Sequence, residues 1–210
     1  MANAIGYEQL ARMIRGGFER VRAHHEELSQ LDSALGDGDH GSAMLRAVDA
    51  GEKAVEQNAE GPAAKTLQAI AWGLMGAAGG APGPLFGSFF LGMSEAAGEG
   101  EMDAGAVAAM FEAGLAKLRK QTKAQPGEKT MVDALVPAVE ALRAAATAGD
   151  VSAALAKAAT AAADGAESTR DMRAKHGKAR HMGDRTLGHV DPGSMSVTYL
   201  FQGFAEALAE

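Results

Sequence analysis

The sequence predicts an all-α protein, an eight-helix up-and-down antiparallel barrel or bundle, and three observations lead to this prediction. Alanine is abundant, aromatic residues form 5% of the chain and runs of β-branched residues are few, a composition typical of helices. Apolar residues recur at i, i+3 and i+4 spacing along most of the chain. The 27 glycines cluster between these periodic stretches, which indicates long, shaped loops that connect the helices.

The helical periodicity assigns eight helices in order along the chain. The first, over residues 7–30, is the clearest, because its apolar residues share one face and charged residues occupy the rest. Ser42 and Asp103 are candidate N-caps of the second and fifth helices, and Trp72 of the third helix is expected in the core. The other helices are expected at about residues 42–57, 62–78, 103–121, 129–148, 152–173 and 194–210, with the fourth helix following the loop at 79–87 and ending at about residue 97. No strand is expected.

Length, charge and cysteine content narrow the class of protein further. The 210 residues favour a single domain over residues 1–210. The chain has no cysteine, which excludes a disulfide framework and a thiolate metal site and fits a cytoplasmic protein. The net charge of −7 disfavours general nucleic-acid binding. Neither a signal peptide nor an apolar run of membrane-spanning length is found, so no membrane association is expected.

Four loops rich in glycine and proline stand out between the helices, over residues 31–41, 79–87, 124–131 and 177–193. They join the first helix to the second, the third to the fourth, the fifth to the sixth and the seventh to the eighth. In an up-and-down bundle, alternate connections fall at the same end. All four loops are therefore expected to meet at one end of the bundle and form one shared site.

The first of these loops carries three carboxylates, Asp32, Asp37 and Asp39, within eight residues. Carboxylates so close together repel one another unless a cation offsets the repulsion. Oxygen ligands without cysteine suit a hard ion such as Mg2+ or Ca2+. The loop also leads into a helix N-terminus, where free N–H groups attract phosphate. A metal beside a phosphate is the arrangement that phosphoryl transfer needs.

Other interpretations of these loops are weighed on their spacing. A common Asp-Gly turn without a metal is the alternative at the first loop. An EF-hand is excluded, because Val48 occupies the twelfth position counted from Asp37, where a bidentate Glu is required. The third loop superficially resembles a phosphate-binding Walker loop. It fails the pattern, because Glu128 stands where Gly must precede the Lys and no strand comes before it.

The stretch over residues 170–185 is basic in an otherwise acidic chain. It has Arg or Lys at six positions, with His176 and His181 among them. A solvated charged loop is one interpretation. A segment that covers phosphates or meets an acidic partner is the other.

The four loops contain these sequence motifs: Gly36-Asp-Gly-Asp-His-Gly41, Gly79-Gly-Ala-Pro-Gly-Pro-Leu-Phe-Gly87, Pro126-Gly-Glu-Lys-Thr-Met-Val-Asp133 and Gly183-Asp-Arg-Thr-Leu-Gly-His-Val-Asp-Pro-Gly193. Together, in this order and over nearly the whole chain, they resemble the dihydroxyacetone kinase L subunit, which is the nucleotide-binding component of that enzyme. The resemblance implies an eight-helix antiparallel barrel with a nucleotide and Mg2+ held in the loops at one end.

The resemblance also implies site residues. By this resemblance the Mg2+ ligands are Asp32, Asp37 and Asp39, and two ions shared among them are one possibility. The resemblance requires no residue of this chain to act as a nucleophile. The residues that match contacts to ADP or ATP come from all four loops: His40, Gly41, Ser42, Ala43, Ala81, Pro82, Thr122, Met131, Lys178, Asp191, Pro192 and Gly193.

The function that the resemblance implies is that of a kinase subunit, a phosphotransferase with an alcohol group as acceptor in glycerol metabolism. A separate K subunit would hold dihydroxyacetone or a related small ketose, and this chain would be active only with that partner. Two phosphoryl donors stay open, ATP and a phosphotransferase-system phosphodonor subunit. Whether the chain forms a homodimer also stays open. The alternative function is a Mg-nucleotide-binding module that reports phosphorylation state to a transcription factor. A lipid-binding barrel ranks last, because it leaves the carboxylates unexplained.

Four positions depart from the family pattern. Ala43 stands where Asn is usual, Pro82 where Ser is usual, Thr122 where Gly is usual and Lys178 where Arg is usual. Ala43 and Pro82 each remove a polar contact, and a lysine lacks the bidentate fork of arginine. The hypothesis that follows is weaker nucleotide contacts, which favour exchange of the nucleotide over its retention.

Overall fold

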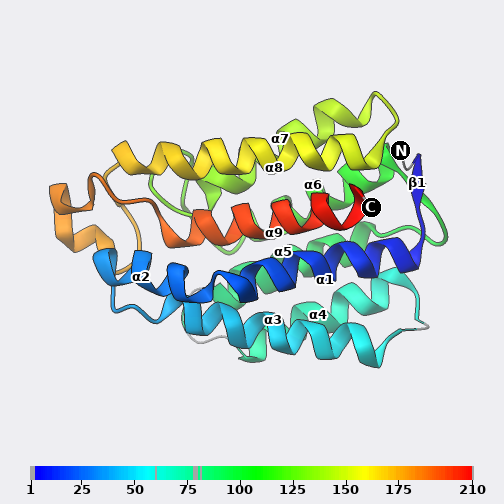
Figure 1. Ribbon diagram of the computed structural model, residues 1–210, viewed down its shortest axis with the longest axis horizontal. Helices are drawn as coiled ribbons and strands as arrows, with labels where there is room; N and C mark the ends of the chain where they lie inside the picture. The colour runs from blue at the N-terminus through cyan, green and yellow to red at the C-terminus, as the bar shows by residue number, and fades with distance from the viewer. Residues whose placement is uncertain (1–2, 60, 78–79, 81, 210) are drawn as a thin grey trace.

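The computed structural model describes residues 3–59, 61–77, 80 and 82–209, and this part of the chain is mostly helical (Figure 1). Long helices lie along one axis and run up and down, which confirms the predicted all-α class. The helices are α1 (Tyr7–Ala23), α2 (His25–Leu35), α3 (His40–Gln57), α4 (Ala63–Ala77), α5 (Pro82–Ala96), α6 (Ala104–Arg119), α7 (Val132–Ala146), α8 (Val151–Ser168), α9 (Pro192–Ala209) and two short 3-10 turns, η1 (Thr169–Asp171) and η2 (Ala179–Thr186).

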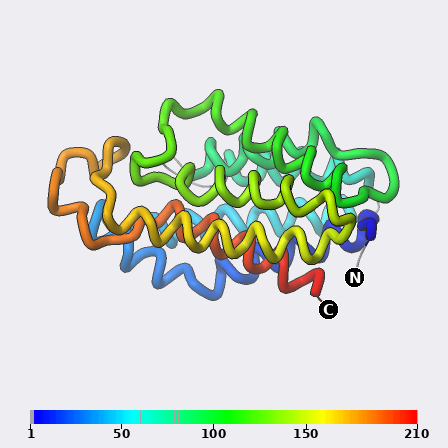
Figure 2. The backbone as a smooth tube through the Cα atoms, turned by 90° about the horizontal axis from the view of Figure 1, so that it is seen from above, coloured from blue at the N-terminus to red at the C-terminus, as the bar shows by residue number. Residues whose placement is uncertain are grey.

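Eight of these helices close into a ring. α1 packs on α3, each helix from α3 to α8 packs on the next, and α9 packs on both α8 and α1. The first and last long helices therefore lie side by side, and the described chain begins and ends at the same end of the barrel (Figure 2). None of the described helices combines the length and hydrophobicity that crossing a membrane requires.

The prediction of one helix over residues 7–30 is wrong, because the chain breaks between α1 and α2. His24 lies at the break, and its ring stacks on that of Tyr199 in α9 with 4.2 Å between the ring centroids. The second helix then continues as far as Leu35. Asp32 consequently lies on a helix, in its last turn, and not in an open loop.

Other local predictions have mixed outcomes. Asp103 caps α6 as expected, since its side chain accepts a hydrogen bond from the N–H of Ala106 at 2.8 Å. Ser42 does not cap α3. The helix begins after Asp39, and the Ser42 hydroxyl, already inside the helix, donates to the Asp39 carbonyl at 2.9 Å. Trp72 is not in the core, because 59% of it is exposed on the outer face of α4.

A small sheet was not expected from the sequence. The strands β1 (Ala4–Ile5) and β2 (Met102–Asp103) pair antiparallel, with Ala4 opposite Asp103 and Ile5 opposite Met102. Strands of two residues are too short for apolar alternation to be visible. The pair ties the start of α1 to the start of α6.

Phenylalanine rings fill the interior of the barrel. Phe18 of α1 contacts Phe90 of α5, and Phe111 of α6 contacts both Phe201 and Phe204 of α9, with ring centroids 5.5–5.9 Å apart. All five side chains are at most 1% exposed. Such aromatic pairs contribute about 0.5–1.5 kcal/mol each beyond the area they bury. Because the interior is filled with side chains, a ligand has to bind at an end of the barrel.

Glycines allow α1 and α9 to approach closely. A Cβ built on Gly203 of α9 would lie 2.2 Å from the carbonyl oxygen of Gly16, and one built on Gly17 would lie 2.3 Å from the ring of Phe204. No real side chain fits at such distances. The close crossing of the first and last long helices therefore requires glycine, which has no side chain, at these positions.

A substitution at this crossing should destabilise the fold. For Gly203→Ala we expect the free energy of unfolding to fall by about 2–3 kcal/mol or more, because the added methyl forces the two helix backbones apart. Denaturant unfolding checks this. The matched control is Gly76→Ala on α4, where nothing lies within 4 Å of the new Cβ, and where alanine should stabilise the helix by about 0.5 kcal/mol. Equal stability of the two variants would contradict the close-packing argument.

Candidate functional site

A cavity of about 520 Å3 lies at the end of the barrel opposite the described termini. This volume is within the range of roughly 300–1,000 Å3 that is typical of small-molecule sites. Side chains and backbone from all four glycine-rich loops line it, so the loops meet at one end as the sequence predicts. The residues predicted for the site that line the cavity are Asp32, Asp37, Asp39, His40, Pro82, Thr122, Met131, Lys178, Asp191, Pro192 and Gly193.

The three aspartates of the first loop converge at the mouth of this cavity. One oxygen atom from each of Asp32, Asp37 and Asp39 lies within 4.8 Å of the others. The backbone explains the convergence: Gly38 has φ of +78°, and a Cβ on Gly36 would lie 2.6 Å from the Asp32 carboxylate. Oxygen ligands of Mg2+ or Ca2+ lie roughly 2.0–2.6 Å from the ion, so oxygens on opposite sides of an ion are roughly 4–5 Å apart. The donor type and spacing of this cluster therefore fit a hard divalent cation.

Lys178 brings a positive charge to the same carboxylates from the last loop. Its ammonium group forms an ion pair with Asp37 and lies 4.0 Å from Asp39. The hydrogen bond from Lys178 lowers the pKa of Asp37, and the same bond raises the pKa of Lys178. Both side chains are more than half exposed, so solvent screens the pair and it adds little to stability. Its effect is to favour the ionised form of Asp37.

His40 begins α3 between the carboxylates and the barrel interior. It is 9% exposed, and its Nε2 lies 2.8 Å from the hydroxyl of Ser196 on α9. Burial lowers the pKa of His40, against the opposing influence of Asp32 and Asp39. At neutral pH the imidazole is therefore uncharged, and it contributes hydrogen bonding and shape to the cavity.

Three of the predicted contact residues, Gly41, Ser42 and Ala43, do not line the cavity in the described part of the chain. They form the first turn of α3 behind His40. Gly41 is enclosed by α2, since a Cβ there would lie 1.8 Å from the carbonyl oxygen of His25. Ala81 lies outside the described residues.

Asp191 lines the cavity and caps α9. Its Oδ2 accepts a hydrogen bond from the N–H of Ser194 at 2.7 Å, and its own N–H donates to the Thr169 hydroxyl at 2.9 Å. Burial raises the pKa of Asp191 to about 6, against the hydrogen bonds from Ser194, which lower it. This carboxyl group therefore changes its protonation state at a pH only slightly below neutral.

The raised pKa makes the contribution of Asp191 to stability depend on pH. The folded value of about 6 lies above the roughly 3.9 of an unfolded Asp, so between these values the folded chain binds the proton more tightly. The stabilisation is fully present below about pH 4 and is lost as pH rises through about 6. Relative to Asp191→Asn, the wild-type chain should lose on the order of 1–2 kcal/mol of unfolding free energy between about pH 4 and 7. A difference between the two proteins that is constant with pH would contradict this.

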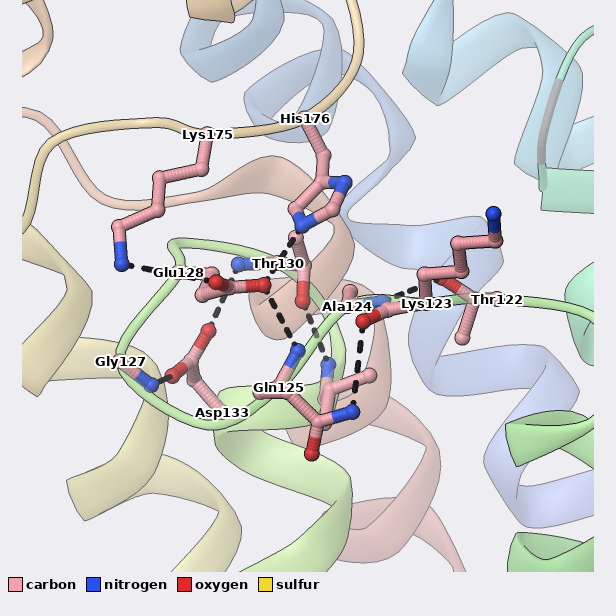
Figure 3. A network of polar contacts seen from close by, with 11 residues as sticks. Thr122, Lys123, Ala124, Gln125, Gly127, Glu128, Thr130, Asp133, Lys175 and His176 are labelled. Atoms are coloured by element: carbon pink, nitrogen blue, oxygen red, sulfur yellow. Dashed lines mark hydrogen bonds and ion pairs between the residues drawn. The ribbon is translucent and has the colours of Figure 1, made fainter.

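The third loop is more structured than its glycine and proline content indicates. Figure 3 shows that the carboxylate of Asp133, at the start of α7, accepts hydrogen bonds from the N–H groups of Gly127 and Thr130. The Glu128 carboxylate accepts one from Gln125 at 2.9 Å. This bond, followed by the contact with His176, holds the pKa of Glu128 at about 2. The carboxylates of Glu128 and Asp133 therefore bind the backbone of the loop at three of its N–H groups.

Several residues that line the cavity were not predicted from the sequence. Lys129 is one: it is 3% exposed and has φ of +59°, and it belongs to the third sequence motif without being predicted as a site residue. A lysine next to a glycine-rich turn was the available signal. The other unpredicted lining residues include Leu85, Phe86, Thr130, Val132, Ala174 and His176.

The chain is similar to proteins of known function along most of its length. The family model described as the DAK2 domain matches residues 34–206. In Listeria innocua, the "PEP-dependent dihydroxyacetone kinase 1, ADP-binding subunit DhaL" is 36% identical over 189 residues, which are 90% of this chain and 90% of that protein. In Mycolicibacterium smegmatis, the "L-erythrulose 1-kinase" is 37% identical over 203 residues, 91% of this chain and 34% of that protein.

A solved structure gives the same result for the fold. The dihydroxyacetone kinase from C. freundii, in complex with AMP-PNP and Mg2+, matches 97% of this chain and 34% of its own chain, with a TM-score of 0.73 and 25% sequence identity. This chain thus spans about a third of each of the two larger kinases and nearly the whole length of the Listeria subunit.

Proposed function

The chain belongs to the DAK2 domain family, and on this premise we propose that it is the nucleotide- and Mg2+-binding subunit of a kinase for dihydroxyacetone or a related small ketose. Residues 1–210 would form one L-type domain. The observation that carries the proposal is the convergence of three carboxylates on a cavity of nucleotide-accommodating size at one end of the barrel. The kinase relatives favour this function over a purely regulatory module.

The residues of the cavity would have different roles in such a subunit. Asp32, Asp37 and Asp39 would hold Mg2+, which when bound neutralises charge on the phosphoryl oxygens. Lys178, from the last loop, places its ammonium group beside the carboxylates of Asp37 and Asp39. The remaining lining residues enclose the nucleotide and exclude water, so catalysis depends on positioning and electrostatics and needs no nucleophile in this chain.

The acceptor would be supplied by a second protein. The Listeria relative, which matches over 90% of both chains, is by its name a subunit. The L-erythrulose 1-kinase, in contrast, has about two thirds of its length outside the match. We therefore infer that the ketose is bound by a separate K-type subunit, and that this chain alone transfers no phosphoryl group. A PEP-dependent donor is supported by the name of the Listeria relative, and ATP is the donor to be tested against it.

Thermal unfolding tests the function directly. With ADP or ATP at about a hundred times its Kd, the folded state should gain about 2.7 kcal/mol, and the gain should require Mg2+ and disappear with chelator. Asp37→Asn and Asp39→Asn should abolish it, because each removes a charged metal ligand. The control is Asp49→Asn, an exposed carboxylate of α3 that pairs with Arg22 outside the cluster, and it should respond as the wild type does.

Two outcomes would contradict the proposal. A full shift in both aspartate variants would mean that the carboxylate cluster does not hold the metal. No shift in the wild type with either nucleotide would mean that the chain binds neither, provided that mass spectrometry of the heat-released supernatant finds no nucleotide already bound.

A further inference from the structure

A basic segment, residues 169–189, crosses the mouth of the cavity between α8 and α9; we call it the strap. It includes η1 and η2, and four of its consecutive residues, from His176 to Ala179, line the cavity. In Figure 2 it forms the loop at the left end of the barrel. Most of its residues are exposed to solvent, as in the solvated-loop interpretation, but the four from His176 to Ala179 line the cavity, which favours the interpretation in which the segment covers the site.

The strap is closed on itself near its base. Gly188 donates its N–H to the carbonyl of Arg170 at 2.8 Å, and the Arg170 guanidinium donates back to the Gly188 carbonyl at 2.9 Å. Further out, the N–H of Ala174 donates to the hydroxyl of Thr186 at 3.2 Å. With its two legs bridged in this way, the strap is expected to move as a unit.

Lys129 of the third loop holds both ends of the strap. Its ammonium donates to the carbonyl of Thr169, at 2.6 Å, and to the carbonyl of His189. Among the described residues, Lys129 is the only non-glycine with a positive φ, a backbone conformation that a β-carbon makes unfavourable. A long cationic side chain in a position that favours glycine indicates that the ammonium contacts offset this strain.

Glu128, the residue before Lys129, contacts the middle of the strap. Its Oε2 lies 2.6 Å from Nε2 of His176, and its Oε1 lies 3.5 Å from the ammonium of Lys175 (Figure 3). Its backbone carbonyl also accepts the N–H of Lys175 at 3.2 Å. These contacts lie two and three residues before Lys178, which meets the carboxylates of the first loop.

We propose that Glu128 and Lys129 are positioning residues that together hold the strap closed over the nucleotide site, and thereby set how slowly the nucleotide leaves and where Lys178 lies. This inference rests on the proposed function, since it needs a nucleotide in the cavity. Neither residue has to touch the nucleotide. Each acts through the strap, one at its ends and one at its middle, because a nucleotide enclosed by the strap leaves only when the strap opens.

A dissociation experiment tests the inference. The protein is loaded with a fluorescent N-methylanthraniloyl ADP and Mg2+ and then chased with excess ADP in a stopped-flow instrument. Glu128→Gln and Lys129→Met should each raise the dissociation rate at least about tenfold, the effect of losing one hydrogen-bonded charge contact. Glu128→Asp, which keeps the carboxylate, should restore part of the slow release. Glu112→Gln removes a carboxylate that pairs with Arg143 between α6 and α7, and it should leave the rate unchanged.

The outcomes separate the inference from the function on which it rests. Wild-type dissociation rates in both Glu128→Gln and Lys129→Met would overturn the positioning role while leaving nucleotide binding in place. Failure of the wild type to bind the fluorescent nucleotide with Mg2+ would overturn the proposed function itself. If Lys129→Met does not fold, Glu128→Gln still decides, because Glu128 is partly exposed and its side chain is not part of the core.

Discussion

The mutual repulsion of three carboxylates at the end of the barrel is the interaction on which the rest of the site depends. One oxygen atom from each of Asp32, Asp37 and Asp39 lies within 4.8 Å of the others, and a nearby positive charge offsets the repulsion between carboxylates at such distances. One such charge comes from Lys178, which lies 141 residues from Asp37 along the chain. Lys178 reaches these carboxylates from the strap, and the third loop contacts the strap at both ends and in the middle.

The barrel provides the rigid frame for this arrangement. Its interior is occupied by phenylalanine rings, and its first and last long helices cross at glycines that allow no added carbon. Tightly packed helices keep their ends at fixed positions. Four loops that emerge from one end of such a frame can present groups from distant parts of the sequence to a single ligand, while the residues within the helices determine stability.

Much of this arrangement was predictable from particular residues. The helical periodicity placed most helices within a few residues of their observed bounds, and Asp103 was recognised as a cap from its type and position. Predictions from local sequence patterns failed where contacts with distant parts of the chain determine the structure. At the break, the ring of His24 stacks on that of Tyr199, which is distant in the sequence. Trp72, expected in the core, lies outside because the ring of helices leaves that face of α4 uncovered by the described chain.

The sequence by itself determined the helical class, the alternation of four unusual loops and the cluster of carboxylates that lies within eight residues. These features are encoded locally, by periodicity, by glycine and proline, and by spacing along one short segment. Only the tertiary structure decided that Glu128 and Lys129 hold residues 169–189, and that a histidine and a lysine of that segment face the cavity. Such pairings join residues some 40 to 60 positions apart. They form because the closed barrel brings its loops together, which no local pattern in the sequence records.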